Sequence, residues 1–297
     1  MKIGYPCINR TITCRGNKTF RLKSYSESRL IVTVGDNLDC LLAILRFNLI
    51  NGIFFFRISS DIVPFASHPV CTFNWQKYFA HKLSAAGRFA MDNGMRISMH
   101  PDQFTIINSI DSEIFLRSRR ELEYHAQLLD LMGLDNTARI QVHVGGVYGD
   151  KRGAMERFAE RFTELDERVR RRLVVENDDR SFNVKDCLLL HQKTGIPVLF
   201  DVFHDSLNPS GLSLSEILPE VAGTWKQSDG LPMFDYSSQK RGARAGQHAE
   251  HIDIGEFLAF IGASKGFDFD IMLEIKDKEK STLKALRALS DKPGVFL

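Results

Sequence analysis

Short apolar runs alternate with longer amphipathic segments along the whole chain. Eight runs rich in β-branched and aromatic residues have the length of buried strands. They span residues 2–5, 53–59, 96–100, 139–144, 172–177, 197–202, 232–237 and 269–275. Helical periodicity is clearest in 36–52, 75–94 and 112–133. Glycines stand where helices should end, at Gly52, Gly94, Gly133 and Gly195.

Strands that alternate with helices predict parallel strand pairing through helical crossovers. Eight such units predict a closed (β/α)8 TIM barrel, and an open doubly wound sheet is the alternative. The longest stretches without periodicity are 6–33, 60–74 and 222–231, and none resembles an interdomain linker. We therefore expect a single α/β domain over residues 1–297.

Composition narrows the class of protein. A formal net charge of +2 argues against a strongly basic protein that wraps nucleic acid, although it allows local basic patches. The five cysteines are scattered and form no CxxC pair, which argues against a disulfide framework and favours a reducing cytoplasm. The first residues show no signal peptide, and no apolar run approaches the length of a membrane span. We expect a cytoplasmic protein that makes no membrane contact.

Side chains that can bind metals recur at the ends of six consecutive predicted strands. These are His100, His143, Glu176, Asp201, Asp235 and Glu274, with His204 and His248 in the loops that follow. In a (β/α)8 barrel the C-terminal strand ends meet at one mouth, where the active sites of this fold lie. The pattern therefore predicts that these side chains converge.

Four of the converging side chains are carboxylates: Glu176, Asp201, Asp235 and Glu274. Like charges in one pocket raise each other's pKa and reduce stability, and divalent cations remove that cost. Imidazoles with carboxylates suit Mn, Zn, Fe or Co. Four carboxylates balance two divalent ions, whereas a third ion leaves positive charge suited to a phosphodiester. Two or three ions can activate a water and stabilise an in-line displacement.

Each of these residues alone has a simpler interpretation as a structural hydrogen-bonding group. An acidic residue after a strand can also cap the next helix. The recurrence over six strands favours the metal site. His68, His81, His125, His191 and His251 are interpreted as surface, loop or core groups, although His251 competes with His248 as the loop ligand.

Several motifs, in order along the chain, match those of one known family. They are GYPCIN (4–9), RISSDIVPFASHP (57–69), SMHPDQF (98–104), HVGGVYGDK (143–151), VENDDRSFNV (175–184), DVFHDSLNP (201–209) and LEIK (273–276). With these motifs the chain resembles the UV damage endonucleases, xylose-isomerase-like barrels related to the endonuclease-IV-type apurinic enzymes. The matches cover nearly the whole chain.

The resemblance implies a DNA repair endonuclease that nicks the backbone immediately 5′ of a UV photoproduct and leaves a 3′-hydroxyl and a 5′-phosphate. It implies two or three divalent ions, with Mn²⁺ expected and Zn²⁺ or Co²⁺ as alternatives. Its partner would be double-stranded DNA that contains the photoproduct. The implied metal ligands are His100, His143, Glu176, Asp201, His204, Asp235, His248 and Glu274. Glu176, Asp201 and Glu274 are the candidate catalytic carboxylates.

DNA contacts are predicted at four places. The resemblance implies that Tyr5 and Asn9 probe the damaged dinucleotide, and that Gln103 and Phe104 wedge into the duplex. The loop 239–250 contains Lys240, Arg241 and Arg244 among glycines, which predicts phosphate contacts. Lys151 is interpreted in the same way. A solvated charged loop is the alternative for these cations.

Two positions depart from the pattern of some relatives. Met233 and Asp235 stand where those relatives have Lys-x-His with a carboxylated lysine, and Phe104 replaces a tyrosine.

Two other functions compete on the same scaffold, an apurinic-site endonuclease and a xylose-isomerase-like sugar isomerase. The wedge favours a photoproduct over an abasic site, and the isomerase lacks a clear catalytic lysine other than Lys276. Because the mouth must admit a duplex, we expect a monomer.

Overall fold

Eight parallel strands close into a barrel in the computed structural model, which describes residues 1–291. The strands are β1 (Ile3–Pro6), β2 (Phe55–Ile58), β3 (Arg96–Met99), β4 (Arg139–His143), β5 (Leu173–Glu176), β6 (Val198–Asp201), β7 (Met233–Tyr236) and β8 (Asp270–Leu273). Each strand pairs with the next in sequence, and β8 pairs with β1. The predicted TIM barrel is confirmed, and the open doubly wound sheet is excluded.

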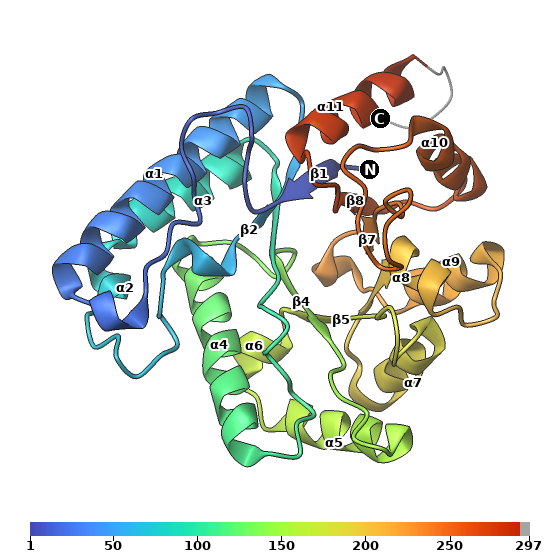
Figure 1. The fold of residues 1–297 in the computed structure, drawn as a ribbon, viewed down its shortest axis with the longest axis horizontal. Helices are drawn as coiled ribbons and strands as arrows, with labels where there is room; N and C mark the ends of the chain where they lie inside the picture. Colours follow the sequence, from blue (N-terminus) through green and yellow to red (C-terminus); the bar gives the residue numbers. More distant parts are fainter. Residues whose placement is uncertain (292–297) are drawn as a thin grey trace.

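Helices lie around the strands, as Figure 1 shows. They are α1 (Glu27–Ile50), α2 (Trp75–Tyr78), α3 (Ala80–Asp92), α4 (Ser112–Leu131), α5 (Lys151–Thr163), α6 (Glu167–Arg170), α7 (Val184–Thr194), α8 (Val202–Leu207), α9 (Leu214–Gly223), α10 (Ile254–Ala263) and α11 (Glu279–Ser290). Short 3-10 turns cover Leu22–Ser24, Ser60–Ile62 and Gln227–Asp229. No helix within residues 1–291 combines the length and apolar character needed to cross a membrane.

Helix boundaries differ from the predicted ones at two places. Helix α1 begins at Glu27, inside the stretch expected to be irregular, because the Ser26 side chain caps it by accepting a hydrogen bond from the Arg29 N–H. The predicted helix 75–94 is divided at Phe79 into α2 and α3. The four predicted glycine ends are confirmed, since all four glycines have positive φ angles between 62° and 74°.

Two layers of side chains fill the inside of the barrel. The lower of these two layers is apolar and consists of Phe55, Val174, Leu199, Met233 and Met272, above the buried arginines Arg96 and Arg139 at the N-terminal strand ends. Residues two apart on a strand face the same way, so the next layer towards the mouth is polar. That layer contains Arg57, Glu176, Asp201, Asp235 and Glu274. The alternation of the strands therefore places the predicted carboxylates directly above an apolar floor.

A disulfide joins Cys14 to Cys40, which corrects the expectation of a chain without disulfides. The two cysteines are 26 residues apart in sequence, but the loop after β1 packs against α1 and brings them together. Cys7, Cys71 and Cys187 are free thiols. Sequence spacing alone could not reveal the pair, because only the path of the loop makes the two residues neighbours.

Candidate metal centre

Seven of the eight predicted ligands form three groups at the barrel mouth. The groups are His100, His143 and Glu176; Glu176, Asp201 and His204; and Asp201, Asp235 and Glu274. Within each group the ligand atoms lie within 4.8 Å of one another, and neighbouring groups share one carboxylate. The predicted convergence of these seven side chains is therefore observed.

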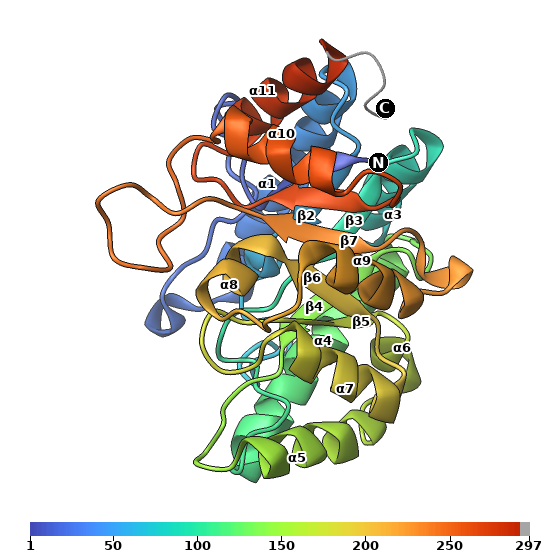
Figure 2. The same ribbon diagram turned by 90° about the vertical axis from the view of Figure 1, so that its right-hand side faces the viewer.

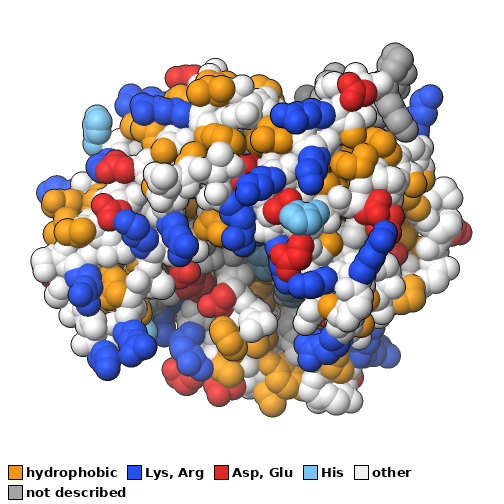
Figure 3. All heavy atoms as spheres, turned by 45° about the horizontal axis from the view of Figure 1, so that its top comes forward, with side chains coloured by type: hydrophobic (Ala, Val, Ile, Leu, Met, Phe, Trp, Pro, Cys, Tyr) orange, Lys and Arg blue, Asp and Glu red, His pale blue; other side chains and the backbone are white. Residues whose placement is uncertain are grey.

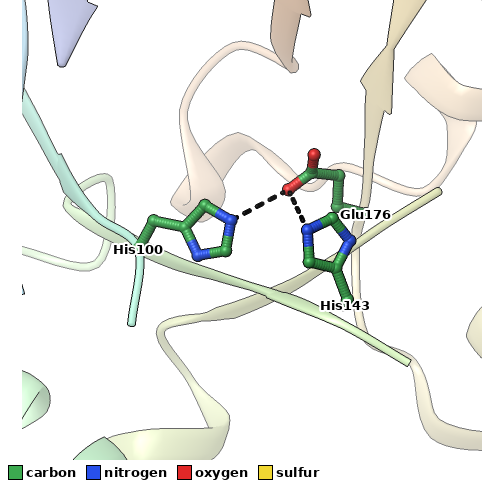
Figure 4. Close-up of side chains that lie close together, drawn as sticks. All are labelled: His100, His143 and Glu176. Atoms are coloured by element: carbon green, nitrogen blue, oxygen red, sulfur yellow. Dashed lines mark ion pairs between the residues drawn. The ribbon is translucent and has the colours of Figure 1, made fainter. Parts of the chain in front are cut away.

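The first group is open to one side and has free nitrogen atoms. His100 Nε2 lies 3.5 Å and His143 Nε2 3.9 Å from Glu176 Oε2, so both rings point at one oxygen (Figure 4). The Nδ1 atoms of both rings are buried and have no partner within residues 1–291. Burial lowers the pKa of His100 to about 4, which keeps this imidazole neutral at pH 7. A neutral imidazole is the form that binds a metal.

The second group uses a strand end and the first turn of α8. Asp201 Oδ1 accepts a hydrogen bond of 2.8 Å from the His204 N–H, so Asp201 does cap the helix. Its other oxygen, Oδ2, lies 3.2 Å from His204 Nδ1, so the cap does not prevent a role as a ligand. His204 Nδ1 is also 3.0 Å from the Asn177 carbonyl oxygen. Burial alone would lower the pKa of His204, but Asp201 and Glu176 raise it to about 11.

The third group contains a cation that the sequence analysis missed. The Arg57 side chain extends from β2, and its Nη2 donates to both oxygens of Asp235 at 2.7 Å. Its Nη1 donates to Glu274. Gln141, on β4, was also missed, and its Nε2 donates to Glu176 Oε2 and Asp235 Oδ2 at 2.7 Å each. The available signal is a charged or amide residue inside an otherwise apolar strand, which is not itself a metal-binding side chain.

Electrostatics indicate that two of the four carboxylates, Asp201 and Asp235, lack enough positive charge nearby to stay ionised easily. Burial raises the pKa of Asp201 well above its usual value. Burial also raises the pKa of Asp235 to about 8, although Arg57 acts in the opposite direction. At Glu274 the effect of Arg57 prevails over burial and lowers the pKa to about 2. Carboxylates that resist ionisation beside unpartnered imidazole nitrogens form a donor set that fits divalent cations.

The eighth predicted ligand, His248, reaches the centre from the loop after β7. Its Nδ1 lies 2.8 Å from the Glu274 carbonyl oxygen and 3.9 Å from Glu274 Oε2. His251, the competing candidate, instead pairs with Asp277 at 2.7 Å. The geometry therefore favours His248 as the loop ligand. Met233, where some relatives have lysine, is completely buried in the apolar floor.

The residues predicted to contact DNA have different degrees of exposure. Gln103 and Phe104 lie on the loop after β3, and Phe104 is 73% exposed. A cavity of about 240 Å³ extends from His100 and His143 to Gln103. In contrast, Tyr5 and Asn9 are buried, and the Tyr5 hydroxyl donates to Asn48 and accepts from Asn9. The structure therefore exposes the two residues predicted to wedge into the duplex and buries the two residues predicted to probe the lesion.

The predicted cations lie on the loop after β7 and, for Lys151, at the start of α5, and most have an acidic neighbour. Lys151 pairs with Asp186 at 2.5 Å, and Lys240 pairs with Glu250 at 2.8 Å. Arg241 is 3.3 Å from Asp253 but remains 93% exposed, and Arg244 is exposed. On the face shown in Figure 3, Lys and Arg side chains lie around a central hollow. These side chains can exchange an acidic neighbour for a phosphate at little cost, because exposed ion pairs are weak.

Comparison with known proteins decides the family. Residues 1–295 match the family described as UV-endonuclease UvdE. The chain belongs to the UvdE family. It is 40% identical to the UV DNA damage endonuclease of Clostridium perfringens, over 98% of this chain and 71% of that protein. It is 34% identical to the enzyme of the same name from Bacillus cereus, over 92% of this chain and 87% of that protein.

Solved structures agree with this assignment to the UvdE family. The crystal structure of SacUVDE has a TM-score of 0.94 and 44% identity, and 98% of each chain is covered. The protein is therefore an enzyme of the UV DNA damage endonuclease family. Endonuclease IV from Thermus thermophilus has a TM-score of 0.58 at 16% identity, over 85% of this chain and 95% of that chain. This second likeness shows a shared barrel fold.

Proposed function

We propose that this protein is a divalent-metal-dependent endonuclease that nicks DNA immediately 5′ of a UV photoproduct, leaving a 3′-hydroxyl and a 5′-phosphate. One observation carries the proposal. A member of the UvdE family has four buried or half-buried carboxylates and four histidines at the mouth of its barrel. Family membership supports the DNA substrate, and the donor set supports the metal dependence.

In this proposal, two groups of three donor side chains each hold one metal ion. One ion would bind His100, His143 and Glu176, and the other would bind Glu176, Asp201 and His204. Mn²⁺ is the expected ion, with Zn²⁺ or Co²⁺ as alternatives. Bound ions would supply an activated water and stabilise charge on the phosphate oxygens. The other predicted ligands, Asp235, His248 and Glu274, surround the place where a third ion would bind.

The chain's own residues hold this machinery in place. Glu176, Asp201 and Glu274 would be the catalytic carboxylates. Gln141 fixes the Glu176 carboxylate through a hydrogen bond of 2.7 Å, which limits the directions in which its oxygens can point. An Nδ1–H of His204 that donates to the Asn177 carbonyl oxygen leaves Nε2 as the ligand atom. The apolar floor below the centre excludes water from that side.

DNA would lie across the mouth with the photoproduct above the carboxylates. Gln103 and Phe104 would insert into the duplex, since both are exposed beside the cavity that borders His100. Lys151, Lys240, Arg241 and Arg244 would contact phosphates. Contact of Tyr5 and Asn9 with the lesion requires a local rearrangement, because both are now buried and Tyr5 lies within β1. In this proposal residues 1–297 form one domain that acts as a cytoplasmic monomer; 292–297 lie outside the described residues.

A nicking assay tests the proposed function. A labelled duplex with one cyclobutane pyrimidine dimer is incubated with the protein and Mn²⁺, and the cut is mapped at nucleotide resolution. We expect one cut directly 5′ of the dimer, which EDTA and Glu176→Gln abolish. Arg170→Ala, at the opposite end of the barrel, is the matched control and should cut normally.

Cutting of an abasic duplex alone would replace the proposal with an apurinic-site endonuclease. No cut on either duplex by the metal-loaded protein would reject both DNA substrates.

A further inference from the structure

The Arg57 guanidinium occupies the third donor group of the metal centre. It is 2% exposed and lies in the inner layer between Asp235 and Glu274. Both oxygens of Asp235 accept from Arg57, and Oδ2 also accepts from Gln141. The Asp235 carboxylate therefore already accepts three hydrogen bonds from two nitrogen atoms. A metal ion at this carboxylate would compete with these hydrogen bonds for its lone pairs.

The charges of the inner layer lead to the same conclusion. Four carboxylates, those of Glu176, Asp201, Asp235 and Glu274, face one permanent cation, Arg57. Two divalent ions and Arg57 add five positive charges to four negative ones, which leaves +1. Three divalent ions and Arg57 would leave +3 in a buried space, which like-charge repulsion opposes. One surplus positive charge is enough to attract a phosphodiester.

We infer that Arg57 is a resident cation that takes the place of a third metal ion, so that the centre binds two divalent ions and Asp235 serves as the partner of Arg57. Arg57 is then a positioning residue, because it acts through Asp235 and Glu274. The inference rests on the metal dependence proposed above and deepens it by fixing the number of ions. It also accounts for Gln141 on β4, which donates a further hydrogen bond to the Asp235 carboxylate.

Metal counting tests this inference without DNA. The purified protein is loaded with Mn²⁺, dialysed, and its bound manganese is measured per chain by mass spectrometry. We expect two ions in the wild type, two in Arg57→Lys, and three in Arg57→Met, where the cation is absent. The double variant Arg57→Met/Asp235→Asn should return to two, because the freed carboxylate is lost. Circular dichroism and thermal melting establish that each variant is folded.

Arg96→Met is the matched control. Arg96 is an equally buried arginine that pairs with Asp270 at 2.8 Å at the other end of the barrel, so its loss should leave the count at two. Three ions in the wild type would overturn the inference, whether or not any variant folds. Two ions in a folded Arg57→Met protein would also overturn it. Nicking by a three-ion wild type would leave the proposed function intact, so the two failures are distinguishable.

A separate observation concerns the segment 10–29, which comprises most of the loop between β1 and α1 and the first turn of α1. Residues 10–29 contain six cations and one acidic residue, Glu27. The cations are Arg10, Arg15, Lys18, Arg21, Lys23 and Arg29. Arg15, Lys18 and Arg29 line a recess of about 600 Å³ together with Phe20. Within residues 1–291, Arg15 and Arg29 form no ion pair, whereas Lys18 pairs with Asp36. A net charge of +5 in twenty residues contrasts with the +2 of the whole chain.

This basic loop is held in a fixed shape. The Cys14–Cys40 disulfide ties it to α1, and Asn37 exchanges hydrogen bonds of 2.8 and 3.0 Å with the Lys18 backbone. The Phe20 ring packs against Phe65 at 5.2 Å. Figure 2 shows the loop, in dark blue, on the same side of the barrel as the orange loop after β7. The two basic loops therefore extend from the mouth face.

We propose that the basic loop 10–29 binds the phosphate backbone of the duplex beside the lesion, at a distance from the cations of loop 239–250. Charge complementarity identifies the partner, because duplex DNA is a regular array of negative charge. Pre-formed shape lowers the entropy cost of binding. This proposal also rests on the proposed function, since it extends the same DNA interface.

The salt dependence of DNA binding tests the role of this loop. Affinity for the dimer-containing duplex is measured from low to high salt for the wild type and for Arg15→Ala/Arg29→Ala. We expect the slope of log K against log salt to fall by about two units in the variant, because each phosphate contact contributes about 0.9. Arg170→Ala/Arg171→Ala removes the same charge at the opposite end of the barrel and should keep the wild-type slope.

An unchanged slope in Arg15→Ala/Arg29→Ala would overturn the assignment of this loop. An equal fall in both double variants would also overturn it, since the effect would then come from overall charge. A wild-type protein that neither binds nor nicks the duplex would instead reject the proposed function itself.

Discussion

The two ends of the barrel interior are built from the same kinds of residue but differ in charge balance. Near the N-terminal strand ends, Arg96 pairs with Asp270 and Arg139 pairs with Asp229. The Trp225 ring lies 5.6 Å from the Arg96 guanidinium and 5.5 Å from that of Arg139. Each arginine there has its own carboxylate. At the mouth, one arginine, Arg57, faces a cluster of four carboxylates.

One end of the barrel therefore serves stability and the other serves function, although the strands between them are only four or five residues long. A balanced buried ion pair needs no further partner, and removing one member leaves an uncompensated charge. An unbalanced cluster reduces stability until a ligand neutralises it, which is why shifted pKa values indicate functional sites. The lower end should therefore respond to mutation through folding, and the mouth through activity.

The largest expected effect is loss of activity in Glu176→Gln. Glu176 belongs to two donor groups, so its charge serves both proposed ions. We expect nicking to fall at least about 1000-fold, because several kcal/mol of electrostatic stabilisation are lost. In the metal-free state the variant should lose little stability in urea, since Asp201 still compensates the charge of His204. Marked destabilisation of Glu176→Gln in urea would contradict the assignment of activity to the mouth and stability to the opposite end.

Asp270→Ala should give the opposite result. It leaves the buried Arg96 guanidinium without its carboxylate, and we expect the free energy of unfolding to fall by about 3 kcal/mol. Manganese content and nicking per folded molecule should stay at wild-type levels. Urea unfolding followed by circular dichroism, with activity assayed at low temperature, measures both. A folded but inactive Asp270→Ala protein would contradict this assignment.

Metal removal should destabilise the wild type through the mouth alone. With Mn²⁺ at 100 times its dissociation constant, linkage predicts a gain of about 2.7 kcal/mol that EDTA abolishes. Asp270→Ala should show the same difference between metal-loaded and metal-free protein. Glu176→Gln should show a much smaller one. Calorimetric melting with and without EDTA makes this comparison, and an equal shift in all three proteins would argue against the predicted ligands.

A pH effect should also arise at the mouth. Burial lowers the pKa of His100 from 6.5 to about 4 in the folded protein. As the pH falls, the unfolded chain therefore takes up this proton first. Stability that is present above pH 6.5 is lost between pH 6.5 and 4. We expect this loss to be roughly 3 kcal/mol in metal-free protein. His100→Asn should flatten that part of the profile, and an unchanged profile would reject the assignment.

The smallest predicted effect is on DNA affinity. Phe104 is 73% exposed, so Phe104→Ala should leave the melting temperature unchanged. Loss of a stacking ring should weaken binding to the dimer-containing duplex about 10-fold, or roughly 1.4 kcal/mol. Phe104→Tyr, which retains the ring, is the matched control and should bind normally. Fluorescence anisotropy distinguishes the two, and equal binding by both variants would remove Phe104 from the interface.

Much of the barrel could be predicted from the sequence because its signals are local. Each strand is a short apolar run, and seven of the eight observed strands lie inside the predicted runs. Strand β1 ends at Pro6, one residue later than expected. Parallel order then follows from the alternation with helices. Seven metal-binding side chains could be placed together because strand ends share one mouth.

The features that sequence could not reveal depend on packing between distant residues. Arg57 meets Asp235 across the barrel, 178 positions away in sequence. The disulfide of Cys14 depends on the route of one loop. Tyr5 was expected to contact DNA, but its ring packs 5.3 Å from Phe56, inside the protein. No local pattern encodes which side of a motif faces solvent.

The loop after β7 connects two properties that are usually measured separately. Gln239 and His248 form an antiparallel bridge, and the Lys240 N–H donates to the Gln247 carbonyl oxygen at 2.7 Å. Arg241 and Arg244 lie in the closed part of this loop, so one hairpin holds both His248 and these arginines. Linkage is reciprocal for equilibrium binding. DNA that orders the loop should therefore tighten metal binding, and metal should tighten DNA binding by the same factor.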